Sequence, residues 1–196
     1  MTEDFLERWL EGVLATPGLT GLVDSAEARR VLHEDALRAR PLIERTSGAI
    51  VDVGSGGGSP GIPLAVAFPD RSFTLLEAER RKCNFLRGIV AELPNVAVVW
   101  GRAEEQTTDV FGIALAKALA KPPVAAELCL PLVRTGGVAI LWVGETAEVE
   151  PVSRVAKCLA GELEAGPEGL LTLRKLSPTP TGFPRRAGVA KKRPLA

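Results

Sequence analysis

The spacing of apolar residues changes near residue 48 and separates two parts of the chain. Before that point, apolar residues recur every three to four positions, which is the period of an amphipathic helix. This spacing predicts one helix over residues 3–14 and a second over residues 25–40. Ser25 is the expected N-cap of the second helix, and Pro41 is expected to end it. The chain is therefore expected to begin with a helical segment.

Beyond that segment, short and nearly continuous apolar runs alternate with helical stretches. Strands that are apolar throughout are typical of a parallel sheet that helices cover on both faces. The predicted strands are residues 49–53, 73–77, 96–100, 112–116 and 137–143. The predicted helices between them are residues 61–68, 79–92 and 122–134.

Two further stretches, residues 153–161 and 169–176, are expected to close the sheet as a pair of strands. The expected fold class is therefore α/β: a Rossmann-like, mostly parallel seven-stranded sheet with helices on both faces and an N-terminal helical extension. We expect this extension over residues 1–45, the sheet domain over 46–176 and a tail without periodicity over 177–196.

Composition adds a size and a charge distribution to this picture. The 196 residues suit one α/β domain, and the 46% hydrophobic content can fill a core. Basic and acidic residues number 24 each, so net charge offers no argument for a nucleic-acid partner. Residues 174–196, however, hold seven basic residues and no acidic one. The sequence therefore predicts a basic tail on a mildly acidic body.

Several functional classes are not expected. Cys83, Cys129 and Cys158 are odd in number and far apart, which fits neither a disulfide framework nor a zinc site, so we interpret all three as packing residues. The first residues lack a basic region followed by an apolar run, and no stretch approaches the ~20 apolar residues of a membrane span. We expect a cytoplasmic enzyme without metal or membrane contact.

A glycine-rich segment directly follows the first predicted strand. Residues 54–58 include four glycines, and ligands of open parallel sheets bind at the carboxyl ends of strands. Glycine lets the backbone approach a ligand because no Cβ intervenes. Pro60 and Pro63 suit the first turn of a helix, with Ser59 as its expected cap. The segment predicts a nucleotide-like ligand, although a purely structural turn is the alternative.

The glycine spacing narrows the choice of ligand. A dinucleotide loop reads G-x-G-x-x-G, whereas Ser59 stands at its third glycine position here. Gly54, Gly56 and Gly58 read G-x-G-x-G instead, and Asp52 precedes them. This combination resembles the signature of S-adenosylmethionine-dependent methyltransferases. A close loop and a carboxylate would suit that cofactor's ammonium and sulfonium charges.

Two further segments support a nucleoside cofactor. Glu77 ends the second predicted strand, where a carboxylate accepts hydrogen bonds from ribose hydroxyls in nicotinamide and methionine cofactors alike. The segment GRAEE, residues 101–105, follows the third strand and would border the adenine. The candidate cofactor-binding residues are Asp52, Gly54, Ser55, Gly56, Gly58, Glu77, Ala78, Arg102, Ala103 and Glu104.

With these residues in place, nearly the whole chain resembles the bacterial small-subunit ribosomal RNA guanine-N7 methyltransferases, the RsmG or GidB family. DVGSGGGSPGIPLA (52–65) is similar to the family's glycine motif, including PGIPL, which methyltransferases at large do not share. TLLEAERRKCNFL (74–86), GRAEE and FPRRAGVAKKRPL (183–195) are similar to three further motifs, and His33 to its H-x-x-D segment. The resemblance implies a class I methyltransferase fold.

The resemblance also implies a reaction. A methyl group would pass from S-adenosylmethionine to N7 of a guanine in 16S ribosomal RNA, so the small ribosomal subunit would be the partner. Guanine N7 carries a lone pair and no proton, so in-line alignment and desolvation would suffice without a general base. The resemblance implies Lys117 and Arg81 as candidate catalytic residues. It implies RNA contacts by His33, Arg185, Arg186, Lys191, Lys192 and Arg193.

The chain departs from the family pattern mainly where RNA would bind. Lys117 replaces an arginine and loses the planar guanidinium fork, and Ala36 replaces the aspartate of H-x-x-D. Gly112 stands where an acidic residue is expected, and Val143 replaces a lysine. Trp142 beside Val143 would offer a stacking surface, or would simply be a core residue at a strand end.

These departures leave three other hypotheses open. The chain could be a cofactor-binding relative that holds RNA or ribosome-assembly intermediates but methylates weakly. It could be a methyltransferase with another acceptor, because fold and loop do not determine the substrate. A nicotinamide oxidoreductase is the remaining alternative, and Ser59 at the third glycine position argues against it.

Overall fold

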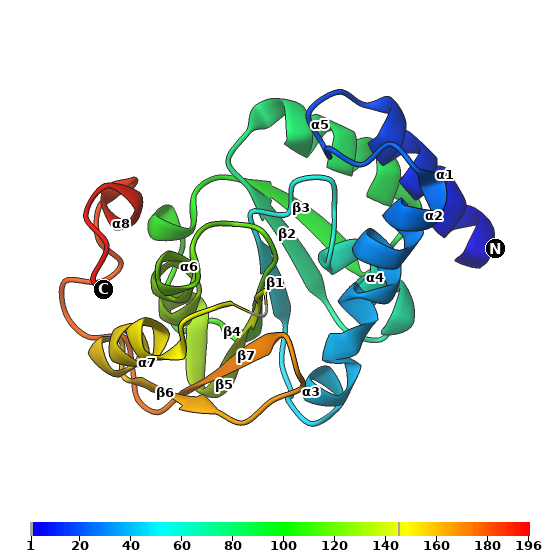
Figure 1. The fold of residues 1–196 in the computed structure, drawn as a ribbon. Coiled ribbons are helices and arrows are strands. Elements are labelled where there is room, and N and C mark those ends of the chain that lie inside the picture. Colours follow the sequence, from blue (N-terminus) through cyan, green and yellow to red (C-terminus); the bar gives the residue numbers. More distant parts are fainter. Residues whose placement is uncertain (1, 145) are drawn as a thin grey trace.

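The computed structural model describes residues 2–144 and 146–196. Met1, the first residue of the expected extension, and Glu145, after the fifth predicted strand, lie outside the described residues. Seven strands form one sheet in the order β3-β2-β1-β4-β5-β7-β6 (Figure 1). The strands are β1 (Ile50–Val53), β2 (Phe73–Glu77), β3 (Val96–Trp100), β4 (Phe111–Ala116), β5 (Val133–Trp142), β6 (Gly161–Glu164) and β7 (Leu170–Lys175).

The sheet is parallel except at one edge. Strands β1 to β5 pair in parallel, whereas β7 runs antiparallel to both β5 and β6. The chain moves outward from β1 through β2 to β3 and then returns to β4 on the other side of β1. The loops after β1 and β4 therefore diverge, which forms the crevice where such sheets bind ligands. The predicted seven-stranded α/β sheet is confirmed.

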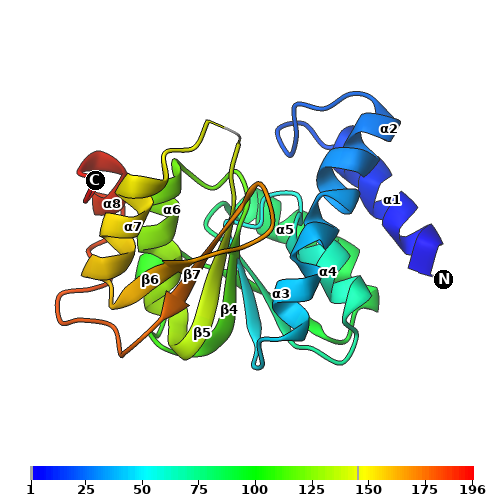
Figure 2. The same cartoon turned by 60° about the horizontal axis from the view of Figure 1, so that its bottom comes forward.

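Helices cover both faces of the sheet (Figure 2). One face packs against helices α1 to α5, and the other packs against α6 and α7. Alternate strand residues serve the two faces: Ile50 and Ile113 contact the first layer, and Val51 and Ala114 the second. The helices are α1 (Thr2–Ala15), α2 (Ser25–Ala28), α3 (Arg40–Glu44), α4 (Gly61–Ala67), α5 (Arg80–Ile89), α6 (Pro122–Cys129), α7 (Val149–Cys158) and α8 (Val189–Lys192). The short turns are η1 (Arg29–Glu34, a π-helix) and the 3-10 helices η2 (Ala36–Ala39), η3 (Val90–Glu92), η4 (Ala103–Glu105) and η5 (Leu130–Leu132).

Helix α1 connects the N-terminal region to the sheet. Its apolar stripe is buried as the periodicity predicts, and Trp9 is fully buried. The indole nitrogen of Trp9 donates a hydrogen bond to the carbonyl oxygen of Gly57 at 2.7 Å. Helix α1 therefore supports the glycine-rich loop from the side.

The second predicted helix is less regular than expected. Its cap is Asp24, whose side chain accepts a hydrogen bond from the Glu27 amide, so Ser25 is the first helical residue rather than the cap. The helical region changes to π and 3-10 turns and continues past Pro41 to the end of α3 at Glu44. Pro41 is tolerated because it lies in the first turn of α3, where its missing N–H has no helical partner.

The prediction of a strand over residues 153–161 is wrong. Most of this stretch belongs to helix α7, because Val152, Val155, Ala156 and Leu159 recur at the helical period and are all buried. The antiparallel partner of β7 is the shorter strand β6. Strand β5 also begins earlier than expected, at Val133, so the helical stretch before it is shorter.

Two smaller expectations concern cysteines and membranes. Cys83 and Cys129 are buried as expected, whereas Cys158 is exposed because it lies on the outer side of α7. Within residues 2–144 and 146–196, no helix has the length and apolar character to span a bilayer.

Candidate functional site

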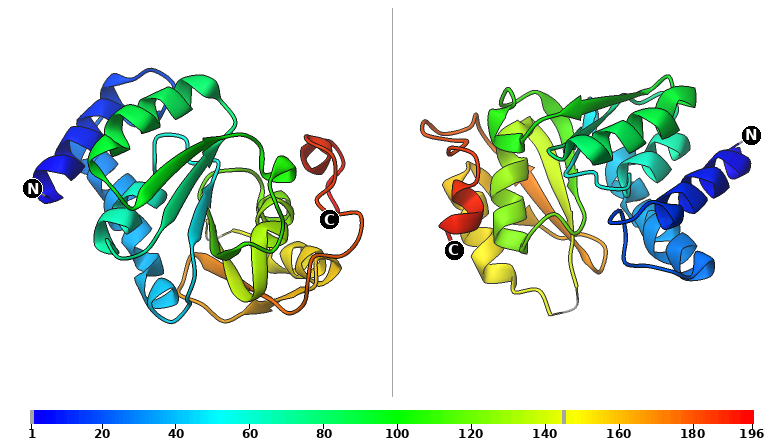
Figure 3. Two further views of the ribbon diagram at one scale, coloured as in Figure 1. Left: turned by 180° about the vertical axis from the view of Figure 1, so that it is seen from behind. Right: turned by 90° about the horizontal axis from the view of Figure 1, so that it is seen from above.

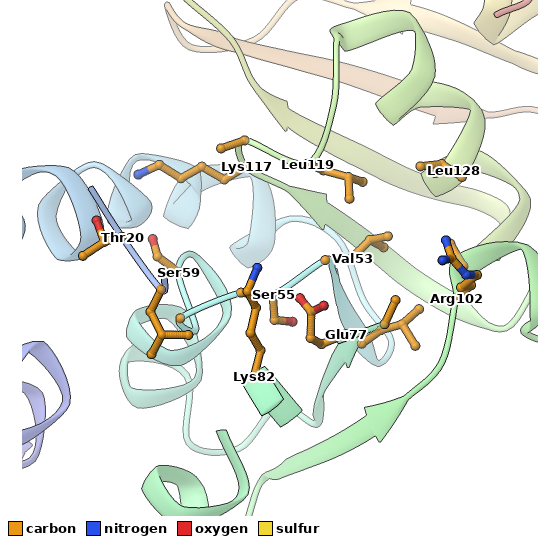
Figure 4. A pocket seen from close by; sticks show the side chains of 18 of the residues that line it. Thr20, Val53, Ser55, Ser59, Glu77, Lys82, Arg102, Lys117, Leu119 and Leu128 are labelled. Atoms are coloured by element: carbon orange, nitrogen blue, oxygen red, sulfur yellow. Dashed lines mark hydrogen bonds between the residues drawn. The ribbon is translucent and has the colours of Figure 1, made fainter. Parts of the chain in front are cut away.

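A cavity of about 550 Å³ opens at the carboxyl ends of the parallel strands (Figure 4). The loops after β1, β2, β3 and β4 form its floor and walls, while the N-terminal region and the C-terminal segment complete its rim. Apolar wall residues include Leu76, Leu119 and Leu128, and polar groups enter from Glu77, Lys82 and Lys117. Such a cavity, mostly apolar with a few placed polar groups, suits a ligand the size of a nucleoside cofactor.

The glycine-rich loop forms the cavity floor and needs glycine at particular positions. Gly54, Gly56 and Gly58 all have positive φ, at 72°, 56° and 105°. A Cβ on Gly54 would lie 2.4 Å from Leu119, and one on Gly58 would lie 2.4 Å from Ile62. The loop therefore depends on glycine for both its backbone conformation and its packing.

Glu77 joins this loop to the end of β2. One carboxylate oxygen accepts a hydrogen bond from the Gly56 amide at 2.9 Å, and the other accepts one from the Glu79 amide at 2.7 Å. The side chain is nearly buried but reaches the cavity, and Figure 4 shows it pointing between Val53 and Lys82. Each oxygen keeps a further lone pair for a ligand hydroxyl.

Asp52 lies behind the loop and does not line the cavity. Its side chain is 1% exposed, and its Oδ2 accepts a hydrogen bond from the Gly61 amide at 3.1 Å. Its Oδ1 is buried without a hydrogen-bond partner in the part of the chain that the structure describes. Burial raises the pKa of Asp52 to about 7. The predicted contact with a cofactor's charged end stays a prediction.

Ser59 does not cap helix α4. The N-cap position belongs to Pro60, and the Ser59 hydroxyl donates a hydrogen bond to the Leu32 carbonyl at 2.7 Å instead. The serine therefore holds the N-terminal helical region against the loop, because Leu32 belongs to the π-helical turn η1.

All of the predicted cofactor-binding residues except Asp52 and Gly58 line the cavity. Ala78 follows Glu77, and Arg102 and Ala103 lie in the loop after β3. Glu104 lines the same wall, and its Oε1 accepts a hydrogen bond from the Gly188 amide at 2.8 Å. This contact joins the loop after β3 to the C-terminal segment.

Lys117, at the end of β4, reaches across to the N-terminal helices. Its Nζ lies 2.6 Å from Oδ2 of Asp35 and also donates to the Val31 carbonyl. Arg38 donates to the other Asp35 oxygen at 2.9 Å. Burial raises the pKa of Asp35, but the hydrogen bonds from Lys117 and Arg38 outweigh it and hold the pKa below its ordinary value.

Asp35 was not among the residues predicted from the sequence. Ala36 stands where an aspartate was expected three positions after His33, and Asp35 lies only one position earlier. Asp35 falls at the junction of the π-helical and 3-10 turns. The irregular helix therefore brings a carboxylate to Lys117 without the expected spacing.

Arg81 lies outside the cavity wall. Its guanidinium donates to the Pro17 carbonyl at 2.7 Å and pairs with Glu79 at 3.4 Å. Its neighbour Lys82, in the first turn of α5, lines the cavity instead and also pairs with Glu79 at 3.1 Å. Sequence reasoning missed Lys82 because the helical phase at the start of α5 decides which neighbour faces inward.

The predicted RNA-binding residues fall into different environments. Arg185 forms a bidentate pair with Glu127 of α6, with both N···O distances at 2.6 Å. His33 is half-buried, its Nδ1 has no hydrogen-bond partner among the described residues, and burial followed by the charge of Arg29 lowers its pKa. Lys191 lines the cavity. The remaining three are exposed: Arg186, Lys192 and Arg193.

The structure explains two of the departures at the family's positions. Gly112 packs against the turn before β1, where an added Cβ would lie 2.0 Å from the Ser47 carbonyl oxygen, so this backbone admits no acidic side chain. Trp142 is half-buried, and its indole N–H donates to the Asp35 carbonyl at 3.1 Å. Val143 is also half-buried and packs against the core.

Comparisons with known proteins agree with this geometry. A family model described as rRNA small subunit methyltransferase G matches residues 3–165. The chain is 36% identical to the ribosomal RNA small subunit methyltransferase G of Synechococcus elongatus, covering 90% of this chain and 82% of that protein. It is 35% identical to the protein of that name from Thermotoga maritima, covering 97% and 86%.

Solved structures show the fold. The 16S rRNA N2 methyltransferase RsmC of T. thermophilus, in complex with AdoMet and guanosine, has a TM-score of 0.56 at 15% identity, covering 78% of this chain and 41% of that one. A precorrin-6y methyltransferase from Geobacter metallireducens has a TM-score of 0.52 at 16% identity, covering 81% and 90%. The expected class I methyltransferase fold is confirmed.

Proposed function

The chain belongs to the rRNA small subunit methyltransferase G family, and from this membership we propose that it methylates N7 of a guanine in 16S ribosomal RNA. Family membership confirms the resemblance seen in the sequence and makes the chain an S-adenosylmethionine-dependent rRNA methyltransferase. The partner is accordingly 16S RNA or the small ribosomal subunit, and the proposed location is the bacterial cytoplasm. The observation that carries the proposal is the cavity formed by the glycine-rich loop, Glu77 and the loop after β3.

The residues around the cavity fit this cofactor. Glu77 offers spare acceptor capacity for the ribose hydroxyls. Leu76, Ala103 and Leu128 provide an apolar wall for the adenine, and the close-packed glycines admit a ligand against the backbone. Asp52, from behind the loop, would contribute negative charge toward the ammonium group once it is ionised.

When bound, S-adenosylmethionine supplies an electrophilic methyl group. Guanine N7 needs no proton removed, and we propose that the chain contributes alignment and exclusion of water rather than a general base. Lys117 would position the guanine by donating to its O6, which leaves the N7 lone pair free to align with the methyl group and the sulfur. Asp35 keeps Lys117 extended across the cavity rim.

RNA contacts are proposed for the cations outside the cavity. Three of these cations are exposed to solvent and would contact phosphates: Arg186, Lys192 and Arg193. Lys191 lies at the cavity rim, and His33 lies in η1, two positions before Asp35. Because Arg185 is paired with Glu127, its proposed contribution is to hold the C-terminal segment against α6. Arg81 would act from outside the wall by keeping the loop after α1 beside α5.

The test combines cofactor binding with methyl transfer. Calorimetry should show micromolar binding of S-adenosylmethionine and of S-adenosylhomocysteine, weakened about tenfold or more in Glu77→Ala, because the ribose hydroxyls lose their acceptor. Labelled methyl transfer to small subunits from a strain that lacks this enzyme should then yield N7-methylguanosine on digestion of 16S RNA.

Three outcomes contradict parts of the proposal. Methyl transfer to another RNA atom would overturn the N7 assignment. Methyl transfer to protein or small molecules would make RNA the wrong acceptor. Cofactor and subunit binding without turnover would favour a binding protein of ribosome assembly instead.

A further inference from the structure

An exposed tryptophan ends the edge strand of the sheet beside the cavity. Trp100 is the last residue of β3, which lies at the edge of the sheet beside β2, and 55% of its surface is exposed. Other exposed apolar residues, such as Val23 and Val110, are aliphatic, and single exposed side chains of that kind are ordinary. Trp100 is instead a large aromatic residue, and it directly precedes Gly101 of the cavity wall.

The Trp100 ring is held in one orientation. Its indole N–H donates a hydrogen bond to the Ala78 carbonyl at 3.0 Å. The guanidinium of Arg80 lies over the ring at 5.5 Å from the centroid, within the range of a cation–π contact. The ring is therefore ordered before any partner binds, and little conformational entropy is lost when something stacks on it.

The ring lies next to the reaction cavity. Gly101 follows it directly, and both Gly101 and Ala78 line the cavity. The ring is therefore adjacent in the chain and by its hydrogen bond to two residues of the cavity wall.

Exposed cations lie near the ring, together with the exposed carboxylates of Glu79 and Glu105. Arg80 has no ion-pair partner among the described residues, and Arg102 is exposed two positions beyond Trp100. The hydrogen bond between Gly188 and Glu104 brings the basic C-terminal segment to the same loop. Figure 3 (left) shows the loop after β3 running toward the red C-terminal segment. The Arg80 guanidinium, Arg102 and the basic C-terminal segment are the groups here that the phosphates of a polyanion would contact.

We propose that Trp100 and Arg80 form a stacking platform for an unpaired RNA base next to the target guanine. The inference rests on the proposed function, which brings single-stranded RNA to the cavity. Proteins bind unpaired bases by stacking them on aromatic rings and guanidinium planes, while nearby cations hold the phosphates. The platform would hold the strand while the guanine enters the cavity.

The experiment compares Trp100→Ala with Trp100→Phe, which keeps an aromatic ring. Leu176→Ala is the control, because Leu176 is also exposed and directly follows β7, which lies next to the edge strand β6 on the far side of the sheet from β3. With unmethylated small subunits as substrate, Trp100→Ala should raise KM about tenfold with little change in kcat, whereas Trp100→Phe and Leu176→Ala should stay within about twofold of the wild type.

A second readout does not depend on methyl transfer. A short single-stranded oligoribonucleotide should quench tryptophan emission of the wild type but not that of Trp100→Phe, because Trp9 is buried and Trp142 half-buried. Cofactor binding, measured by calorimetry, should be equal in all variants.

Unchanged KM in Trp100→Ala, or equal losses in the Ala and Phe variants, would overturn stacking. A KM effect with intact subunits but none with naked 16S RNA, together with no quenching, would assign the surface to a ribosomal protein. If the wild type itself failed to bind the cofactor or methylate subunits, the proposed function would fail, while the quenching result would still decide about the platform.

Discussion

Asp52 shows how burial changes the chemistry of a single carboxyl group. Burial raises its pKa from 3.8 to about 7, and hydrogen bonds from Gly61 and Ser55 offset this only in part. The folded protein therefore holds a proton that the unfolded chain loses near pH 4. The stability that this proton contributes is present at low pH and is lost as the pH rises through about 7.

We predict that Asp52→Asn removes this pH dependence. Between about pH 5 and pH 8, the free energy of unfolding of the ligand-free wild type should fall relative to that of the variant, by up to about 3 kcal/mol. Urea unfolding of both proteins at several pH values measures the difference, and all other titrating groups cancel. Parallel curves for the two proteins would show that Asp52 is ionised throughout.

Gly112 lies where the packing of the backbone leaves no room for a side chain. We predict that Gly112→Asp, which introduces the acidic group expected from the family resemblance, destabilises the fold by at least about 2 kcal/mol, because its Cβ would collide with the Ser47 carbonyl. Gly21→Asp is the control, since no atom lies within 4 Å of an added Cβ there. Thermal and urea unfolding measure both, and equal stability of the two variants would contradict the steric argument.

Among the secondary-structure elements, the irregular helical region of η1 and η2 is connected to the sheet through Asp35. Asp35, at their junction, binds Lys117, which directly follows β4, and Arg38 from η2. The indole of Trp142 from β5 binds the Asp35 carbonyl. One residue thus connects the N-terminal helices to two strand ends at the site.

We predict that Asp35→Asn lowers kcat for methyl transfer about tenfold with a smaller effect on cofactor affinity, because Lys117 loses its charged partner. Lys117→Arg should keep more activity than Lys117→Ala. Steady-state kinetics and cofactor calorimetry provide the measurements. Glu34→Gln, which changes an exposed neighbouring carboxylate, is the matched control, and an equal loss there would refute a specific role for Asp35.

An ion pair between Arg185 and Glu127 attaches the C-terminal segment to α6, and its two side chains differ in burial. The side chain of Glu127 is 4% exposed, whereas that of Arg185 is 22% exposed. Removal of the arginine leaves a buried carboxylate without a partner, while removal of the glutamate leaves an arginine that water can reach.

We therefore predict that Arg185→Ala costs about 3 kcal/mol of stability and more than Glu127→Ala does. Urea unfolding tests the order, and limited proteolysis tests release of the segment. Arg186→Ala is the control: its exposed side chain should leave stability unchanged. The reverse order of the two losses would contradict this reading of the pair.

For the molecule as a whole, net charge is zero, but residues 174–196 hold seven basic residues and no acidic one, and Lys191 among them lines the cavity. Affinity for RNA should therefore fall with salt. We predict that replacing Arg186, Lys192 and Arg193 together by alanine reduces the slope of log K against log salt by about 2, since each phosphate contact on single-stranded RNA adds about 0.7. Filter binding to 16S RNA at several salt concentrations measures it, and an unchanged slope would exclude this segment from the RNA interface.

Local sequence patterns predicted much of the architecture. The parallel strands, helix α1 and the glycine-rich loop are encoded by residues close together in the chain, so periodicity and spacing reveal them. The position of Glu77 at the end of β2 follows in the same way. The error at residues 153–161 has the same origin, because a short apolar stretch suits strand and helix alike until its packing is known.

The order of elements along the chain was therefore sufficient to predict the fold and the place of the cavity, although Asp52 and Gly58 do not line it. Only folding decided which side chains meet across long sequence distances: Asp35 with Lys117, Arg185 with Glu127, and Arg80 with Trp100 close to the cavity. Folding also placed Asp52 behind the loop and turned Lys82 rather than Arg81 toward the cavity. These outcomes depend on burial and on the helical phase of elements packed against one another, which no local pattern records.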